Sequence, residues 1–164
     1  MLLTGIWTGA SNDDGKTAKA SNLASARYVS DASASSSGRH KIGDDVFIGY
    51  WAYRCVSAKW KDAIGSEYTQ EYPDANFLVI DLLARNNDRT ASVLAPVKLV
   101  DEENREYEES SKGIFLENSF GLLKSVNPGV TSSGYIAFDV PPGTYALKVS
   151  GGFASGKSEL IDLK

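Results

Sequence analysis

The longest apolar run of the chain, residues 76–88, constrains the fold more than any other feature. Turn-forming residues bound it on both sides, and no run in the chain approaches the length of a membrane-spanning helix. With a period of two, its inward positions are Leu78, Ile80, Leu82 and Ala84. Its outward positions are Phe77, Val79, Asp81, Leu83 and Arg85. We therefore predict a buried strand whose outward face is partly exposed or carries an Asp/Arg pair across strands, and which ends at residues 86–88.

Length and composition predict one domain with a tail. The chain has 164 residues, 42% of them hydrophobic, which suffices for a single core. A net charge of −4 and a pI near 5.0 argue against nucleic-acid binding, which needs a concentrated basic surface. The single cysteine, Cys55, and the single histidine, His40, exclude an intramolecular disulfide, a multi-cysteine metal site and a histidine-based zinc cluster. We expect no cofactor.

The first 38 residues differ in composition from the rest. Residues 1–9 are apolar and then polar, which is typical of the exit end of a membrane anchor or signal whose beginning is missing; a frayed terminus is the alternative. Residues 10–38 are rich in Ser and Ala and predict a flexible linker, hence a disordered N-terminal tail. We place the folded domain at residues 39–164, and any membrane attachment at this N-terminal anchor.

Short strands separated by Gly and Pro turns fill the domain. Residues 46–48 and 51–59 predict a hairpin or kinked strand about Gly49 and Tyr50, with Trp51, Tyr53 and Cys55 on one face, so Cys55 is expected to be a small core residue. Further strands are expected at 92–100, 105–108, 133–140, 145–149 and 159–163. Turns are expected at 101–104, 127–129 and 141–143, and the apolar segments 114–116 and 120–126 are ambiguous. This pattern predicts an all-β fold, a two-sheet antiparallel sandwich.

Four fragments in register resemble the DUF4352 family: residues 77–87, residues 99–107, the turn at 127–129 and residues 134–141. The resemblance covers about residues 42–163. It implies an immunoglobulin-like β-sandwich of the telokin and MPT63 type, in a bacterial or phage protein that works outside the cytoplasm, often tethered by a Ser-rich linker. The family supplies no catalytic residues to carry over. This chain lacks the lipidated cysteine of many members, and Leu83 stands where a small polar residue is usual.

Two motifs resemble enzyme signatures without their context. Residues 10–17 fit a relaxed phosphate loop, and residues 77–81 mimic a strand that ends in a magnesium-binding Asp. No strand precedes that loop and no helix is evident after it, so we do not expect a nucleotide hydrolase. A Ser/His/Asp hydrolase would need His40 as its base, and His40 sits at the linker boundary, where we expect an exposed side chain.

The acidic turn could bind calcium, because its carboxylates are hard oxygen ligands. These are Asp101, Glu102, Glu103, Glu106, Glu108 and Glu109. The spacing is not that of a dedicated calcium loop, and a solvated hairpin tip, partly neutralised by Arg105 and Lys112, is the favoured reading.

Exposed aromatic side chains are the best candidates for a ligand site. Residues 61–75 form a long polar connection, and long loops on rigid sandwiches often bind ligands. We expect at most two of the aromatic side chains to face a ligand, and the better candidates are Trp60, Tyr68 and Tyr72, off the regular strands. The leading hypothesis is a non-enzymatic binding or adhesion module outside the cytoplasm, whose partner is a protein or a cell-envelope component. The alternative is a structural or shielding envelope or phage accessory protein that acts through assembly.

Overall fold

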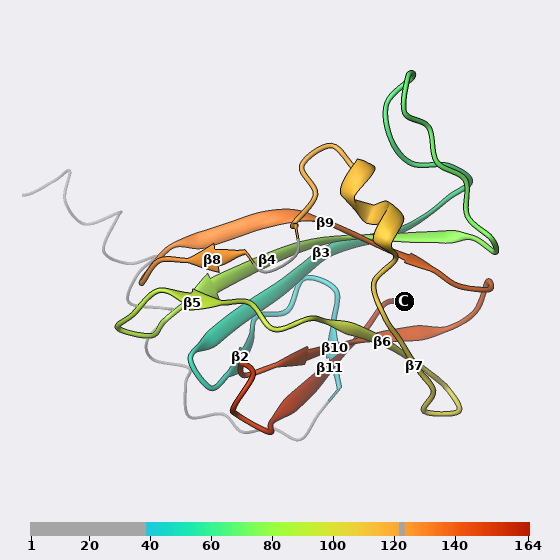
Figure 1. Ribbon diagram of the computed structural model, residues 1–164. Helices are drawn as coiled ribbons and strands as arrows, with labels where there is room; N and C mark the ends of the chain where they lie inside the picture. Colours follow the sequence, from blue (N-terminus) through green and yellow to red (C-terminus); the bar gives the residue numbers. More distant parts are fainter. Residues whose placement is uncertain (1–38, 122–123) are drawn as a thin grey trace, which may run out of the picture. The chain divides into compact units, whose positions relative to one another are not determined.

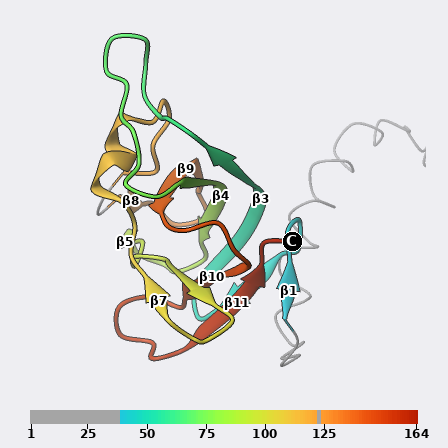
Figure 2. The same cartoon turned by 90° about the vertical axis from the view of Figure 1, so that its right-hand side faces the viewer.

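The structure, a computed structural model, describes residues 39–121 and 124–164 as two stacked sheets with a small two-stranded ribbon (Figures 1 and 2). The five-stranded sheet contains, in order, β1 (His40–Lys41), β11 (Ser158–Asp162), β10 (Tyr145–Ser150), β6 (Lys98–Asp101) and β7 (Glu106–Tyr107). The four-stranded sheet contains β2 (Val46–Ile48), β3 (Trp51–Lys61), β4 (Phe77–Asn86) and β9 (Thr131–Asp139). The ribbon pairs β5 (Ser92–Val93) with β8 (Ser125–Val126), and a 3₁₀ helix, η1, spans Ser111–Phe115.

The main core lies between the two sheets and is built from alternating side chains. β4 contributes Leu78, Ile80, Leu82 and Ala84, all of them buried, as its period of two predicts. Each large side chain removed from water here contributes about 1.5–3 kcal/mol. The Tyr53 hydroxyl donates to the carbonyl of Ser150 at 2.7 Å, so a hydrogen bond also links the two sheets.

The second strand of the first hairpin, β3, is longer than expected. β2 pairs with the start of β3 about the turn at Gly49 and Tyr50, which confirms the predicted hairpin. β3 then continues past a bulge between Cys55 and Ser57 and pairs with β4 as far as Lys61. Cys55 is buried as predicted, and burial, with a smaller effect from the nearby Asp81 carboxylate, raises the pKa of its thiol to about 11.

Asn86 ends β4, and its side chain connects this strand end to the turn that follows and to β8. Its buried side-chain amide donates to the carbonyls of Thr90 and Val126, both at 2.8 Å, and its Oδ1 accepts the amide of Asp88. Every polar atom of this buried amide group has a partner, so the strand end costs little in unsatisfied polarity.

The all-β sandwich predicted from the sequence is confirmed, with further differences in detail. β1 pairs with β11 in parallel rather than antiparallel. The ambiguous segment 114–116 lies at the end of η1 rather than in a strand. The expected strand at 92–100 breaks at residues 94–97, where Pro96 has no amide to donate. The predicted anchor remnant, linker, disordered tail and phosphate-loop pattern lie outside the described residues.

Candidate functional site

Residues 62–76 form a folded hairpin-like loop that projects from the end of the sandwich beside η1 (Figures 1 and 2). Ile64 and Glu71 form a bridge in which each amide donates to the other's carbonyl, at 3.0 and 2.8 Å. Gly65 has φ +101°, and a Cβ there would meet the carbonyl oxygen of Thr69 at 2.1 Å, so the tight turn requires glycine. The loop therefore has its own internal hydrogen bonds and a buried anchor, Ile64.

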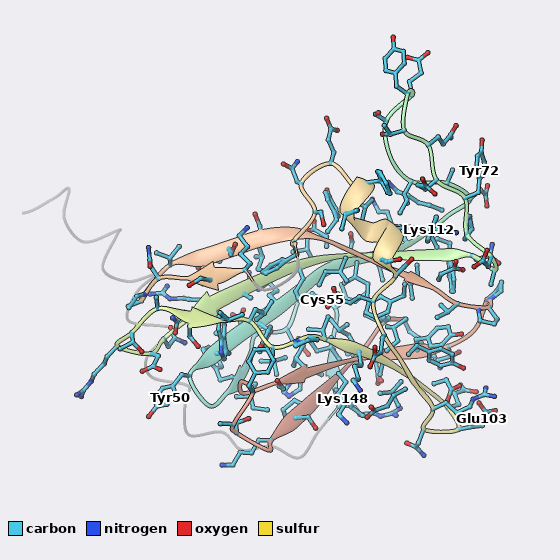
Figure 3. The ribbon with its side chains drawn as sticks, in the orientation of Figure 1. Tyr50, Cys55, Tyr72, Glu103, Lys112 and Lys148 are labelled. Carbon is cyan, nitrogen blue, oxygen red and sulfur yellow. The ribbon has the colours of Figure 1, made fainter. Side chains whose placement is uncertain are left out.

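Two other elements fasten the base of this loop. The Asp139 carboxylate, at the end of β9, accepts the amides of Asp74 and Ala75 at 2.7 and 2.9 Å. Lys112 of η1 donates its Nζ to the carbonyl of Tyr72 at 2.7 Å and lies 3.7 Å from the Asp74 carboxylate. Figure 3 shows Lys112 beneath the base of the loop that carries Tyr72. The loop is thus tied to the sheet on one side and to η1 on the other.

A second, smaller core lies between this loop, η1 and the outward face of the four-stranded sheet. We call it the outer cluster; its members are Ile64, Phe77, Val79, Leu116 and Ala137. Phe77 and Val79 were expected on a partly exposed face, and that expectation is wrong, because residues distant in sequence cover them. The outward face of β4 is therefore apolar and buried over its first half.

The loop and η1 together present exposed apolar side chains to solvent. We call this the loop–helix surface; it comprises Tyr68, Tyr72, Ile114 and Phe115. Tyr68, at the tip, is 92% exposed, and Tyr72 is 62% exposed. Exposed apolar side chains on a fastened support are a common feature of protein-binding surfaces. Sequence reasoning identified the two tyrosines and missed Ile114 and Phe115, whose apolar run was the available signal.

Trp60 does not join the two tyrosines. It lies within β3, opposite Leu78 in the register, so the expectation that it lies off the regular strands is wrong. β3 extends this far because β4 gives it a partner as far as Phe77. The Trp60 ring lies 6.2 Å from the ring of Tyr145 on the other sheet and remains 43% exposed. Trp60 therefore packs at the open end of the main core rather than in the loop–helix surface.

Asp101, the first carboxylate of the acidic turn, is saturated by donors from the protein itself. Asp101 is buried and accepts the amides of Glu103 and Arg105, the Arg105 guanidinium at 2.6 Å and the Tyr107 hydroxyl at 2.9 Å. Burial alone would raise the pKa of Asp101, but the hydrogen bonds from Arg105 and Tyr107 outweigh it and lower that pKa to about 2.

Two lysines of the five-stranded sheet neutralise Glu106, on the far side of this turn. Glu106 pairs with Lys98 and Lys148, whose hydrogen bonds lower its pKa. Lys112, expected to serve this role, instead fastens the 62–76 loop. In residues 39–121 and 124–164, no three His, Cys, Asp or Glu side chains gather into a group that could hold a metal ion.

The other residues considered for catalysis lie far from an enzyme-like arrangement. His40, expected to be exposed, is half-buried on β1, with its Nε2 3.8 Å from the Glu159 carboxylate. Asp81 lies in the middle of β4, in an antiparallel sheet, and not at the end of a parallel strand as a nucleotide site requires. Asp81 makes no ion pair with any described residue, so the pair expected across the strands is not formed by this carboxylate.

The second half of the outward face of β4 is open. A shallow depression of about 430 Å³ lies there, lined by side chains that include Val56, Asp81, Leu83, Asn118 and Tyr135.

The chain folds into no helix in its described part that is long and apolar enough to cross a membrane.

Solved structures share this fold at low sequence identity. The yjhA protein from Bacillus subtilis matches with a TM-score of 0.59 and 14% identity, over 76% of this chain and 99% of that one. A secreted protein from Mycobacterium tuberculosis, MPT63, matches with a TM-score of 0.55 and 13% identity, over 79% and 99%. An uncharacterised β-sandwich protein from Clostridium difficile matches with a TM-score of 0.51 and 12% identity, over 79% and 97%. At these identities the likeness shows the fold alone.

The family comparison agrees with the resemblance read from the sequence fragments. No curated protein matches the chain. The family model described as a domain of unknown function, DUF4352, matches residues 40–159, which run from β1 into the start of β11 and include the loop–helix surface. The chain therefore belongs to the DUF4352 family.

Proposed function

We propose that this protein is a non-enzymatic binding module that works outside the cytoplasmic membrane and recognises a protein or cell-envelope component through the loop–helix surface. The observation that carries the proposal is the fastening of the 62–76 loop by Lys112 and Asp139 beneath two exposed tyrosines. A loop held in one conformation loses little entropy when it binds a partner.

The chemistry of the surface also favours binding of a macromolecule. Tyrosine gives a large contact area with few rotatable bonds, and it is enriched among the residues that dominate binding energy. Ile114 and Phe115, from the adjoining η1, extend the apolar contact area beyond the two rings. The secreted nature of MPT63, a protein of the same fold, supports an extracytoplasmic location.

Co-sedimentation with cell envelopes isolated from the organism that produces the protein, before and after protease treatment, tests the proposal. The full chain should be retained, and the double variant Tyr68→Ser/Tyr72→Ser should lose about 90% or more of the retained fraction, since loss of two hot-spot residues costs at least about 2 kcal/mol. Loss of retention after protease treatment would identify a protein partner, and unchanged retention would identify a glycan or lipid component.

Tyr50→Ser is the matched control. Tyr50 is 63% exposed, much like Tyr72, and lies at the opposite end of the molecule (Figure 3). This variant should be retained like the natural chain. Equal retention of the double variant would contradict the proposal. So would a stable homo-oligomer that dissociates in the double variant, because that result assigns the surface to self-assembly.

A further inference from the structure

The open half of the four-stranded sheet's outward face forms a depression with two walls of different origin. It is shallow and open, with a volume of about 430 Å³. Leu83 of β4 forms part of the floor, and Tyr135 of β9 lies directly opposite Asp81 in the register. The lining therefore combines one carboxylate with the apolar groups of Val56, Leu83 and Tyr135 and with the polar side chains of Asn118 and Ser133, on a surface that no described segment covers.

One wall of the depression depends on a close approach of two backbone segments. The amide of Phe120 donates to the carbonyl of Tyr135 at 2.8 Å, and the amide of Tyr135 donates to the carbonyl of Asn118 at 2.9 Å. A Cβ on Gly134 would lie 2.6 Å from the Cα of Phe120, so this approach requires glycine. The segment that follows η1 is thereby held against the edge of β9 (Figure 1).

The opposite wall comes from the bulge in β3. The bulge places Val56 between Cys55 and Ser57 as an extra residue without a partner on β4, and its side chain is exposed into the depression. Val56 and Leu83 thus give the depression an aliphatic lining beside the Asp81 carboxylate.

Asp81 is not neutralised by the cations on the same face. Arg54 is held by Asp45, with two hydrogen bonds of 2.7 and 2.6 Å. Arg85 is four residues further along the strand, so its Cα lies about 13 Å from the Cα of Asp81 at a rise of about 3.3 Å per residue. Lys59 occupies the diagonal position, since its register partner is Val79, and forms no salt bridge with Asp81 among the pairs found in the described residues.

We propose that this depression is a second binding site, independent of the loop–helix surface, that accepts a lysine side chain of a partner polypeptide. The aliphatic stem packs on Val56 and Leu83, and the ammonium group donates to the Asp81 carboxylate beside the face or edge of the Tyr135 ring. A carboxylate beside the aliphatic groups of Val56 and Leu83 matches a compact cation on a hydrocarbon chain better than it matches an anion.

Titration of the ¹⁵N-labelled full chain with a capped Gly-Lys-Gly peptide, followed by NMR, tests the site. Saturable shifts should be confined to amides around Leu83, Ser133 and Tyr135, with a Kd of about 1–10 mM, as expected for one buried side chain. A capped peptide with norleucine in place of lysine keeps most of the stem and lacks the ammonium group, and it should not saturate at about 30 mM.

Variants separate the carboxylate from general electrostatics. Asp81→Asn should weaken binding of the lysine peptide about tenfold or more, because it removes the charged acceptor. Glu117→Gln removes the same charge from an exposed residue next to Asn118, and it should change the Kd by less than about twofold. Lys59→Met removes the competing cation and should strengthen binding by about twofold.

Three results of the peptide titrations would overturn this proposal. These are the absence of localised shifts with the lysine peptide up to about 30 mM, equal affinity for the norleucine peptide, and equal affinity in Asp81→Asn. Shifts at the same amides that depend on protein concentration without peptide would assign the surface to a second copy of this chain, which also overturns it. The Tyr68→Ser/Tyr72→Ser variant should bind the lysine peptide normally, so failure here is distinct from failure at the loop–helix surface.

Discussion

One half of the outward face of β4 is buried and the other half is open to solvent, although both belong to one strand. Phe77 and Val79 are buried in the outer cluster, beneath the 62–76 loop and η1. Asp81 and Leu83 line an open depression. The difference comes from segments far away in sequence, because the strand's own alternation is the same throughout. The covered half supports a projecting loop, and the open half is left available to a ligand.

The largest effect expected from this comparison is on stability. Phe77→Ala should destabilise the protein by about 3–5 kcal/mol, because it empties a fully buried site. Leu83→Ala, on the same face six residues along, should cost less than about 1 kcal/mol, because its side chain is only partly buried. Urea unfolding of both variants measures the difference, and equal losses would show that the two halves are not distinct.

A smaller effect is expected where the covered half ends. Gly134→Ala should cost about 1–3 kcal/mol, since its Cβ would clash with the backbone of Phe120 and displace the segment that walls the depression. Ser133→Ala, at an exposed neighbour, should stay within about 0.5 kcal/mol of the natural chain. Thermal unfolding of the two variants compares them. A neutral effect of Gly134→Ala would show that the wall does not depend on the close approach of Phe120 to Gly134.

Much of the sandwich and the two loop tyrosines, Tyr68 and Tyr72, could be predicted from local pattern, whereas the rest of the candidate sites could not. The inward residues Leu78, Ile80 and Leu82, the hairpin about Gly49, and the burial of Cys55 follow from a period of two and from turn chemistry. These features depend only on neighbours in sequence, which a single chain displays directly.

The predictions that were wrong concern features that depend on contacts between segments distant in sequence. Val79 is buried because Ile64 and Leu116 cover it, and no pattern within β4 records that cover. Trp60 lies within β3, contrary to the expectation, because pairing with β4 sets the length of β3 and the sequence of β3 alone does not show it. The depression around Asp81 depends on its register with Tyr135, which the sequence alone does not specify.

A still smaller effect should follow from loosening the clamp under the loop. Lys112→Met removes the hydrogen bond to the carbonyl of Tyr72 and the contact with Asp74, at a global cost below about 1 kcal/mol because both groups are partly solvated. Amide hydrogen exchange should accelerate at residues 62–76 and stay unchanged in β4. Lys157→Met, on an exposed turn, is the control, and equal exchange in the two variants would mean that Lys112 does not fasten the loop.

Asp101 is fully paired, whereas Asp81 forms no ion pair with the residues that the structure describes. The pKa of Asp101 falls from its usual 3.8 to about 2 on folding, so its contribution to stability is complete above pH 4 and is lost as the pH falls toward 2. Asp101→Asn should therefore flatten the dependence of the unfolding free energy on pH between about pH 4 and pH 2. Urea unfolding across this range measures the slope, and a slope equal to that of the natural chain would contradict the role of the Arg105 and Tyr107 hydrogen bonds.

The most direct test of the account is whether the loop that carries Tyr68 and Tyr72 is ordered before it meets a partner. Backbone ¹⁵N relaxation of the free full chain reports this on the picosecond-to-nanosecond scale. Order parameters of about 0.8 or above at residues 64–75 are predicted, close to those of β4, because Lys112, Asp139 and the Ile64–Glu71 bridge fix the loop. Values below about 0.6 across these residues would contradict the claim that the binding surface is preformed.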